Sequence, residues 1–92
     1  MIMFYIYIIE SIKNSELYVG FTDDLKRRIE EHNHEANVST KHGVPWQVIY
    51  YEACTNKRDA VRRERYLKTS QGMRLAKRRL KEYFFDKKQI KK

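Results

Sequence analysis

The chain has 92 residues, of which 20 are Lys or Arg and 12 are Asp or Glu, giving a formal net charge of +8. This length fits one small domain and excludes a core with a separate cofactor domain. The single cysteine excludes an intrachain disulfide and a zinc site of four Cys ligands, and it favours a reducing, cytoplasmic setting. The apolar opening of nine residues is too short for a membrane span and lacks the basic start of a signal peptide.

The charge is unevenly distributed along the chain. Residues 1–56 hold 5 basic and 8 acidic side chains, whereas residues 57–92 hold 15 and 4, so the second part carries a net charge of +11. A basic surface of this kind binds the phosphates of nucleic acids by releasing their counterions. The sequence therefore predicts a nucleic-acid partner, and a solvated, lysine-rich helix is the alternative interpretation.

Two runs rich in β-branched and aromatic residues come first: residues 4–10 (FYIYIIE) and residues 16–21 (ELYVGF). The short link between them has the length of a hairpin loop. If residues 11–14 form this loop, Glu10 pairs with Ser15, and Tyr7 then lies opposite Tyr18 with both rings on one face of the sheet.

A helix is predicted over about residues 24–34, with Thr22 or Asp23 as its N-cap. One face of this helix holds the positions i, i+3, i+4 and i+7, which are Leu25, Arg28, Ile29 and His32. Arg28 and His32 are therefore expected at the border of the buried stripe.

Three further elements are predicted in order: a loop over residues 35–46, a third strand over residues 47–54, and a helix over residues 57–68. Asn56 is the expected N-cap of this helix. Glu64 falls on its apolar face, four residues after Ala60 and three before Leu67. A carboxylate that faces inward needs an explanation.

Gly72 is expected to break the helical run, and a last helix is predicted over about residues 73–85. Its apolar residues face inward, whereas Arg74, Arg78 and Lys81 face outward. We expect one domain over residues 1–85, followed by a frayed basic tail over residues 86–92.

Five of these side chains have the chemistry of a phosphodiester hydrolysis site: Tyr7, Tyr18, Arg28, His32 and Glu64. Glu64 would hold one divalent cation through a hard oxygen ligand. Arg28 would neutralise charge on the phosphoryl group. A tyrosine whose pKa is lowered near the metal would take a proton from the attacking water, with His32 or the other tyrosine as its proton relay.

Each of these residues also has an ordinary structural interpretation. Tyrosine in a strand commonly packs in a sheet, and a single arginine commonly lies on the surface. Glu64 could pair with Arg28 or Arg63. The His-x-His sequence at residues 32–34 lacks further ligands at zinc-site spacing.

The ordered set of Tyr5-Ile6-Tyr7, Tyr18-Val19-Gly20, DLKRRIEEHN and AVRRERYLK resembles the GIY-YIG nuclease superfamily. The chain is most similar to its small stand-alone bacterial members, which are similar to the N-terminal nuclease domain of the bacterial repair excinuclease. The resemblance covers residues 4 to about 81. It implies an α+β fold in which a small three-stranded antiparallel sheet is flanked by three or more helices, in the order ββα…βαα.

The resemblance also implies an activity. It points to an endonuclease that depends on Mg²⁺ or Mn²⁺, uses no small-molecule cofactor, and cuts DNA during repair or the processing of branched or damaged DNA. By position it implies Tyr7, Tyr18, Arg28 and His32 as catalytic residues and Glu64 as the catalytic metal ligand. The basic residues expected to contact nucleic acid are Arg63, Lys68, Arg74, Arg78 and Lys81.

The chain departs from the family pattern in three places. Tyr5 replaces the glycine of the first motif, and Phe21 stands where the repair nuclease has a lysine. Some members use an asparagine that follows the helix carrying the metal-binding glutamate. In this chain the residue that could replace it is Gln71. These departures motivate an alternative, a nucleic-acid-binding module that retains the fold without the chemistry. A protein-interaction module with a tyrosine-rich sheet is a third interpretation.

Overall fold

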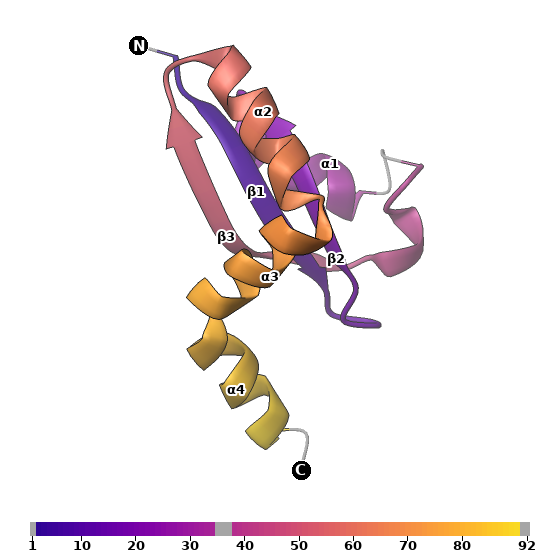
Figure 1. The fold of residues 1–92 in the computed structure, drawn as a ribbon. Helices are drawn as coiled ribbons and strands as arrows, with labels where there is room; N and C mark the ends of the chain where they lie inside the picture. The colour runs from indigo at the N-terminus through magenta and orange to yellow at the C-terminus, as the bar shows by residue number, and fades with distance from the viewer. Residues whose placement is uncertain (1, 35–37, 91–92) are drawn as a thin grey trace.

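The structure is a computed structural model that describes residues 2–34 and 38–90. Its elements are β1 (Phe4–Ser11), β2 (Leu17–Thr22), α1 (Leu25–Asn33), a short 3₁₀ helix (Lys41–Gly43), β3 (Trp46–Cys54), α2 (Lys57–Leu67), α3 (Ser70–Arg79) and α4 (Lys81–Ile90). The strands form one antiparallel sheet in the order β2-β1-β3 (Figure 1). This arrangement confirms the predicted α+β fold. No helix in the described ranges is long and apolar enough to cross a membrane.

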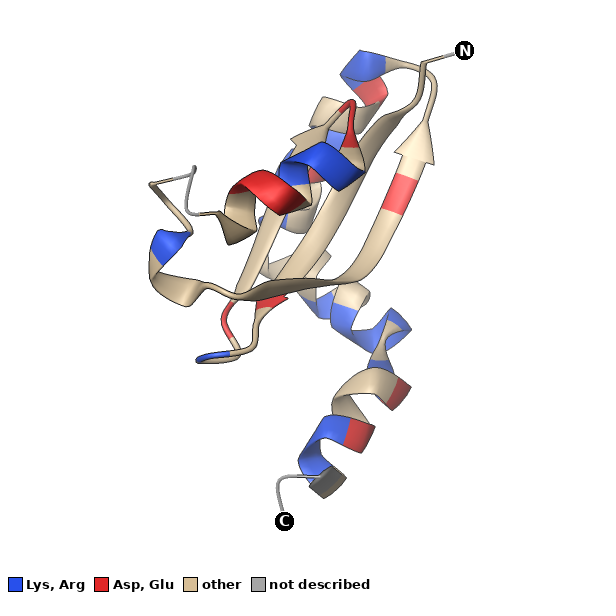
Figure 2. Ribbon diagram, turned by 180° about the vertical axis from the view of Figure 1, so that it is seen from behind, with Lys and Arg blue, Asp and Glu red and all other residues tan. Residues whose placement is uncertain are grey.

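Helices cover both faces of the sheet, so the central strand β1 is buried on each side. Helix α2 lies over one face and α1 over the other, as the two opposite views show (Figures 1 and 2). Because side chains of a strand alternate between faces, Ile6 and Ile8 pack towards α2, whereas Tyr7 and Ile9 pack towards α1 with Trp46. Tyr7 therefore lies in a core of its own.

The hairpin register differs from the predicted one by two residues. Glu10 pairs with Leu17 rather than with Ser15, and Tyr7 lies opposite Gly20 rather than opposite Tyr18. Because the side-chain period of a strand is two, this shift leaves Tyr7 and Tyr18 on the same face. The predicted face is right and the predicted pairing is wrong.

Local hydrogen bonds of the hairpin loop explain the shift. The Ser11 hydroxyl accepts from the backbone N–H groups of Lys13 and Asn14, each at 3.1 Å, and the Asn14 side chain accepts from the N–H of Glu16 at 2.9 Å. Ser15 takes a positive φ of 66°. The loop therefore covers residues 12–16 and is longer than the one predicted.

Helix caps explain where α1 and α2 begin. Asp24 caps α1, with its carboxylate accepting from the N–H of Arg27 at 3.1 Å, so the predicted caps Thr22 and Asp23 are wrong. Thr22 is a buried residue at the end of β2, and its hydroxyl instead accepts from the N–H of Asp24. The predicted cap of α2 is confirmed, because the Asn56 side chain accepts from two N–H groups of the first turn.

Gly72 does not break the helical run as predicted. It lies inside α3, whose N-cap is Thr69. An added Cβ at Gly72 would lie 2.0 Å from the carbonyl oxygen of Tyr66. The glycine therefore allows α3 to pack closely against the end of α2, which a side chain would prevent.

The C-terminal part is also more ordered than predicted. The single helix expected over about residues 73–85 is two helices, and α4 continues through the stretch from Asp86 that was expected to fray, as far as Ile90. Two α4 side chains bind the buried carboxylate of Glu10: Tyr83 donates its hydroxyl hydrogen to it, and Lys87 donates from its ammonium group. These long-range bonds hold α4 against the end of the hairpin. Residues 91 and 92 of the predicted tail lie outside the described part.

The ring of Tyr7 lies directly over Gly20, its partner on β2. A Cβ added at Gly20 would lie 2.2 Å from Tyr7 Oη and 2.3 Å from Cζ, much closer than any van der Waals contact allows. The absence of a side chain at this position is therefore what gives the Tyr7 ring its place.

We predict that Gly20→Ala lowers the free energy of unfolding by about 1–3 kcal/mol, because the ring must shift in a packed core. Tyr7→Leu removes the hydroxyl oxygen and the two ring carbons that the new methyl group would meet, so Gly20→Ala should cost much less in that background. Urea denaturation of the wild type, both single variants and the double variant measures this coupling. Equal costs of Gly20→Ala in both backgrounds would contradict the predicted contact.

Candidate active site

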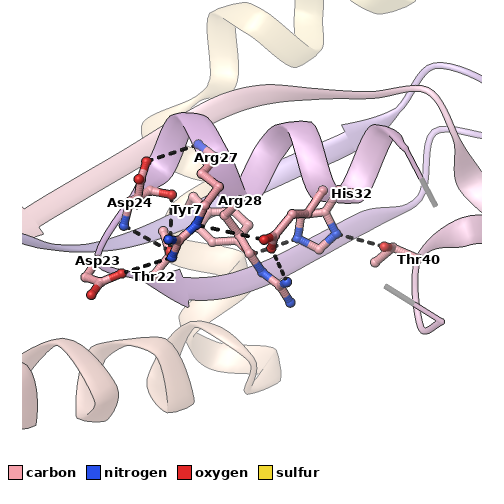
Figure 3. A network of polar contacts seen from close by, with 9 residues as sticks. Tyr7, Thr22, Asp23, Asp24, Arg27, Arg28, His32 and Thr40 are labelled. Atoms are coloured by element: carbon pink, nitrogen blue, oxygen red, sulfur yellow. Dashed lines mark hydrogen bonds and ion pairs between the residues drawn. The ribbon is translucent and has the colours of Figure 1, made fainter. Parts of the chain in front are cut away.

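Tyr7 lies at the centre of the candidate site, on the middle strand. Its side chain is 1% exposed. Its hydroxyl reaches helix α1, with 2.8 Å between Tyr7 Oη and His32 Nε2. One buried hydrogen bond therefore joins the sheet to α1 (Figure 3).

His32 is fully buried in the last turn of α1, further inside than the border position predicted for it. Its second ring nitrogen, Nδ1, lies 2.8 Å from the hydroxyl oxygen of Thr40 (Figure 3). Thr40 in turn accepts at its carbonyl from the indole N–H of Trp46, at 2.8 Å. Both nitrogens of His32 are thus occupied by protein groups, which leaves neither for a metal ion.

Tyr18 packs beside this pair without joining its hydrogen bonds. Its ring lies 5.3 Å from the His32 ring and 6.5 Å from the Trp46 ring, edge to face in both cases. Its hydroxyl makes no hydrogen bond with another residue in the described ranges.

Arg28 lies one helical turn before His32, and its charge acts on Tyr7. Its side chain is 30% exposed, and its Nη1 donates to Glu31 at 2.9 Å. Arg27, one residue earlier, points further out and pairs with Asp23 at 3.6 Å (Figure 3). The guanidinium of Arg28 therefore stands between the buried Tyr7 hydroxyl and solvent, where it can meet an anion.

Glu64 approaches the site from the other side of the sheet. It lies on α2 between the buried residues Ala60 and Leu67, and its side chain is 19% exposed. Its carboxylate pairs with Lys68 at 3.0 Å, not with the predicted alternatives Arg28 or Arg63. Its negative charge acts on the Tyr7 hydroxyl, whose pKa it helps to raise. Burial is the larger cause of that rise, and Glu64 is one of three side chains whose charge acts on Tyr7, with Arg28 and Tyr18.

A shallow pocket connects the two helices along the edge of β2. Its lining comes from the strands, from α1 and from the first residue of α2: Phe4, Phe21, Thr22, Asp23, Arg27, Arg28, Glu31 and Lys57. Phe21 contributes an apolar wall to this pocket. Its cations are Arg27, Arg28 and Lys57 and its carboxylates are Asp23 and Glu31, so the lining carries a net positive charge, which suits an anion.

Burial controls the protonation of the central pair. It raises the pKa of Tyr7 to about 12, against the opposing effect of the Arg28 guanidinium. Burial, with a smaller contribution from the Arg28 charge, lowers the pKa of His32 to about 4. At neutral pH the Tyr7 hydroxyl is therefore protonated and the His32 ring uncharged, so one ring nitrogen donates and the other accepts in the bonds to Tyr7 and Thr40. The protein's own groups act against the lowered tyrosine pKa that the sequence led us to expect beside a metal.

Residues 3–77 match the GIY-YIG catalytic domain. The chain belongs to the GIY-YIG family. This is a family of nucleases, and its members generally depend on a divalent metal. No solved structure matches the chain significantly.

Similar proteins are small members called UPF0213 proteins, a name that states no activity. One from Clostridium perfringens is 39% identical over 67 residues, which cover 72% of this chain and 71% of the relative. One from Staphylococcus saprophyticus is 38% identical and covers 71% and 79%, and one from Haloquadratum walsbyi is 36% identical and covers 71% and 73%.

The fold explains why the two tripeptides of the GIY-YIG domain belong together. The last residue of the first, Tyr7, lies over the last residue of the second, Gly20. The first residue of the second, Tyr18, packs on His32, to which Tyr7 is hydrogen-bonded. The two tripeptides therefore pack against each other on neighbouring strands.

Sequence reasoning missed three residues of this site. Gly20 was read only as part of a motif, Glu31 was not expected to bind Arg28, and Thr40 was read as part of a polar loop. The contacts of Thr40 with His32 and Trp46 depend on how the loop folds back. No spacing along the chain signals them.

The predicted nucleic-acid contacts differ in how free their charges are. Arg63 is bound by Glu52 through two nearly parallel hydrogen bonds of 2.9 Å, and Lys68 is paired with Glu64. Arg74, Arg78 and Lys81 are exposed on α3 and α4 and have no acidic partner within the described residues. The basic residues with unpaired side chains among those described are therefore concentrated on α3 and α4, where the ribbon carries much of its blue (Figure 2).

The lowered pKa of His32 predicts acid sensitivity of the fold. Between pH 6.5, its ordinary pKa, and about 4, the unfolded chain binds a proton at this histidine that the folded protein excludes. The free energy of unfolding should therefore fall as the pH is lowered through this window, by a total on the order of 3 kcal/mol. Tyr7, Thr40, Tyr18, Arg28 and Glu31 are the groups that surround the ring.

Urea denaturation at several pH values between 7 and 4.5 measures this effect. His32→Gln should flatten the pH dependence, whereas His34→Gln, an exposed histidine at the C-cap of α1, should leave it steep. Equal slopes for the wild type and His32→Gln would show that His32 is not held uncharged.

Proposed function

We propose that this protein is a divalent-metal-dependent endonuclease that hydrolyses phosphodiester bonds of DNA. The observation that carries the proposal is the buried Tyr7–His32 hydrogen bond, with the charges of Arg28 from α1 and Glu64 from α2 acting on Tyr7 and a pocket beside Arg28 that Lys57 also lines. These groups supply a phosphate contact, a proton path and a carboxylate within one small site.

Arg28 is proposed to bind the phosphoryl group at the scissile position. The planar fork of N–H donors of its guanidinium group matches the oxygen atoms of a phosphate. Its side chain is partly buried, and a charge stabilises a transition state more strongly where water is partly excluded. Glu31 holds one of its nitrogens at 2.9 Å and so limits the directions in which the guanidinium can point. The remaining donors are left for phosphate oxygens.

Tyr7 and His32 are proposed to carry the proton from the attacking water. In the tautomer that this transfer requires, the Tyr7 hydroxyl donates to Nε2, and its oxygen accepts a hydrogen from water while its own proton moves to His32. Thr40 holds the ring in the tautomer that this transfer needs. The hydroxyl of Tyr18, with no protein partner among the described residues, is free to hydrogen-bond a phosphate oxygen or the water.

Glu64 is the residue that we propose as metal ligand. Mg²⁺ commonly binds through one or two carboxylates and keeps several waters, and the described residues hold no cluster of three His, Cys, Asp or Glu side chains that would suit a more demanding metal. The donor set therefore fits Mg²⁺ or Mn²⁺. A cation bound there supplies positive charge that stabilises the phosphoryl oxygens and lowers the pKa of nearby hydroxyl groups.

The basic surface of α3 and α4 is proposed to hold the DNA backbone, with Arg74, Arg78 and Lys81 as contacts and Arg63 and Lys68 as weaker ones because each is paired. Such contacts position a duplex without reading its sequence. A function in repair or in processing branched DNA follows from the excinuclease resemblance and is part of the same proposal.

One observation favours a second candidate, a nucleic-acid-binding module without catalysis. Lys68 occupies Glu64 at 3.0 Å and competes with a cation for the carboxylate. Phe21 also removes a possible phosphate contact from the pocket wall. This module would bind DNA in a salt-dependent way without metal-stimulated cutting.

The distinguishing measurement is cleavage of plasmid and branched DNA with Mg²⁺ or Mn²⁺. We expect Glu64→Gln, Tyr7→Phe and Arg28→Ala each to lower the cleavage rate by about 10²- to 10³-fold, as the removal of one catalytic contact typically does. Glu30→Gln changes an exposed carboxylate of α1 and should leave the rate unchanged.

Retained folding is checked by thermal melting of each variant. Equal residual cutting by all variants would mean a contaminating nuclease and would remove the enzyme proposal. Salt-dependent gel shifts without any metal-stimulated cutting would instead favour the binding module.

A further inference from the structure

A second groove lies at the far end of the hairpin, away from the pocket beside Arg28. Its apolar lining comes from Leu17 at the start of β2, from Met73 on α3, and from Phe84 and Phe85 on α4. Phe85 is 56% exposed, which is unusual for so large an apolar side chain. The protein itself therefore leaves one aromatic face of this groove uncovered.

Lysines surround these aromatic rings. Lys77, Lys81, Lys87 and Lys88 all line the groove. On α4, Lys81, Phe84, Phe85 and Lys88 follow the spacing i, i+3, i+4 and i+7, so they form one continuous face of the helix. Lys77, Lys81 and Lys88 have no acidic partner within the described ranges.

The one acidic residue of the groove does not repel anions. Glu10 is 2% exposed, and its carboxylate is bound by Lys87 and by the Tyr83 hydroxyl. Of the acidic residues of α4, Glu82 borders Phe85 at the spacing i, i+3, but neither Glu82 nor Asp86 lines the groove. The groove therefore presents aromatic rings within a field of positive charge.

This groove lies along the same edge strand as the candidate active site. Leu17 begins β2, and Gly20, beneath the Tyr7 ring, is three residues further along. At about 3.3 Å per residue, the two positions are separated by roughly 10 Å. A nucleic-acid strand with a helical rise of about 3.4 Å per nucleotide spans that distance in about three nucleotides.

We infer that this groove binds an unpaired stretch of nucleic acid, with a base stacked on Phe85 and the flanking phosphates on Lys81, Lys88 and Lys77. The inference rests on the proposed function and deepens it, because it assigns a substrate with a single-stranded or frayed segment a few nucleotides from the scissile phosphate. Aromatic rings between cations are the usual platform for unpaired bases, whereas paired bases keep their faces covered.

The contrast with a second exposed aromatic residue supports this occupant. Tyr51 on β3 is 55% exposed, as Phe85 is, but its pocket is lined by Asp23, Asp24 and Glu30 with Lys26 as the only cation. That pocket repels phosphates. Tyr51 is therefore a control of matching exposure and opposite surroundings.

The experiment measures the binding of a fluorescein-labelled 15-nucleotide single strand and of a hairpin duplex by fluorescence anisotropy, in the presence of a chelator. Phe85→Ala should weaken single-strand binding by about 5- to 100-fold, as the loss of one base stack does, and duplex binding by less than twofold. Phe85→Trp should retain the affinity, and Tyr51→Ala should leave both affinities unchanged. An oligonucleotide carrying 2-aminopurine should lose fluorescence on binding the wild type and not on binding Phe85→Ala.

The inference is overturned if Phe85→Ala weakens single-strand and duplex binding equally, or not at all. It is also overturned if the Phe85-dependent ligand is a vesicle of phosphatidylserine and phosphatidylcholine and not an oligonucleotide. Metal-dependent cleavage that Glu64→Gln abolishes, with no effect of Phe85→Ala on binding, would retain the proposed function and remove this inference. Base stacking at Phe85 without cleavage by any form of the protein would retain this inference and remove the proposed nuclease activity.

Discussion

The contact between the Tyr7 ring and Gly20 is the constraint on which the site depends. A buried tyrosine on a central strand needs room for its ring, and a neighbouring strand with side chains on the same face removes that room. Gly20 restores it, so the hydroxyl can pass over β2 towards α1 and meet Nε2 of His32. The pairing of the two strands, the position of α1 and the hydrogen bond of the pair are thus fixed together.

The same burial that orders the Tyr7–His32 pair makes it chemically inert by itself. It keeps the tyrosine protonated and the histidine uncharged, so neither is a strong base in its resting surroundings. The charged side chains assigned to the site, Arg28 on α1 and Glu64 on α2, are both partly exposed to solvent and lie outside the buried pair. This separation suits a site that becomes active only when an anionic substrate and a cation arrive, because the resting protein then carries no reactive group.

Much of the fold and most residues of the candidate site could be predicted from the sequence, because both depend on side chains that recur at the regular spacings of helices and strands. Helical spacing found Arg28, His32 and Glu64, and strand alternation found the shared face of Tyr7 and Tyr18. The hairpin register was wrong by two residues, since it depends on hydrogen bonds of the Ser11 hydroxyl inside the loop. Thr40, the role of Gly72 and the docking of α4 escaped prediction because each depends on residues distant in the sequence or on backbone contacts with no periodic signal.

Strand β1 connects the two ends of the molecule. Its middle residue Tyr7 organises the candidate active site, and Glu10, three residues later, anchors α4 through Tyr83 and Lys87. A buried ion pair adds little net stability compared with apolar residues of the same size, because desolvation offsets its attraction. What Glu10 provides is direction, since only one orientation of α4 brings Tyr83 and Lys87 to the same carboxylate. That orientation turns Phe84, Phe85 and the lysines beside them towards the end of β2, so one strand sets both the proposed site of chemistry and the groove that extends from it.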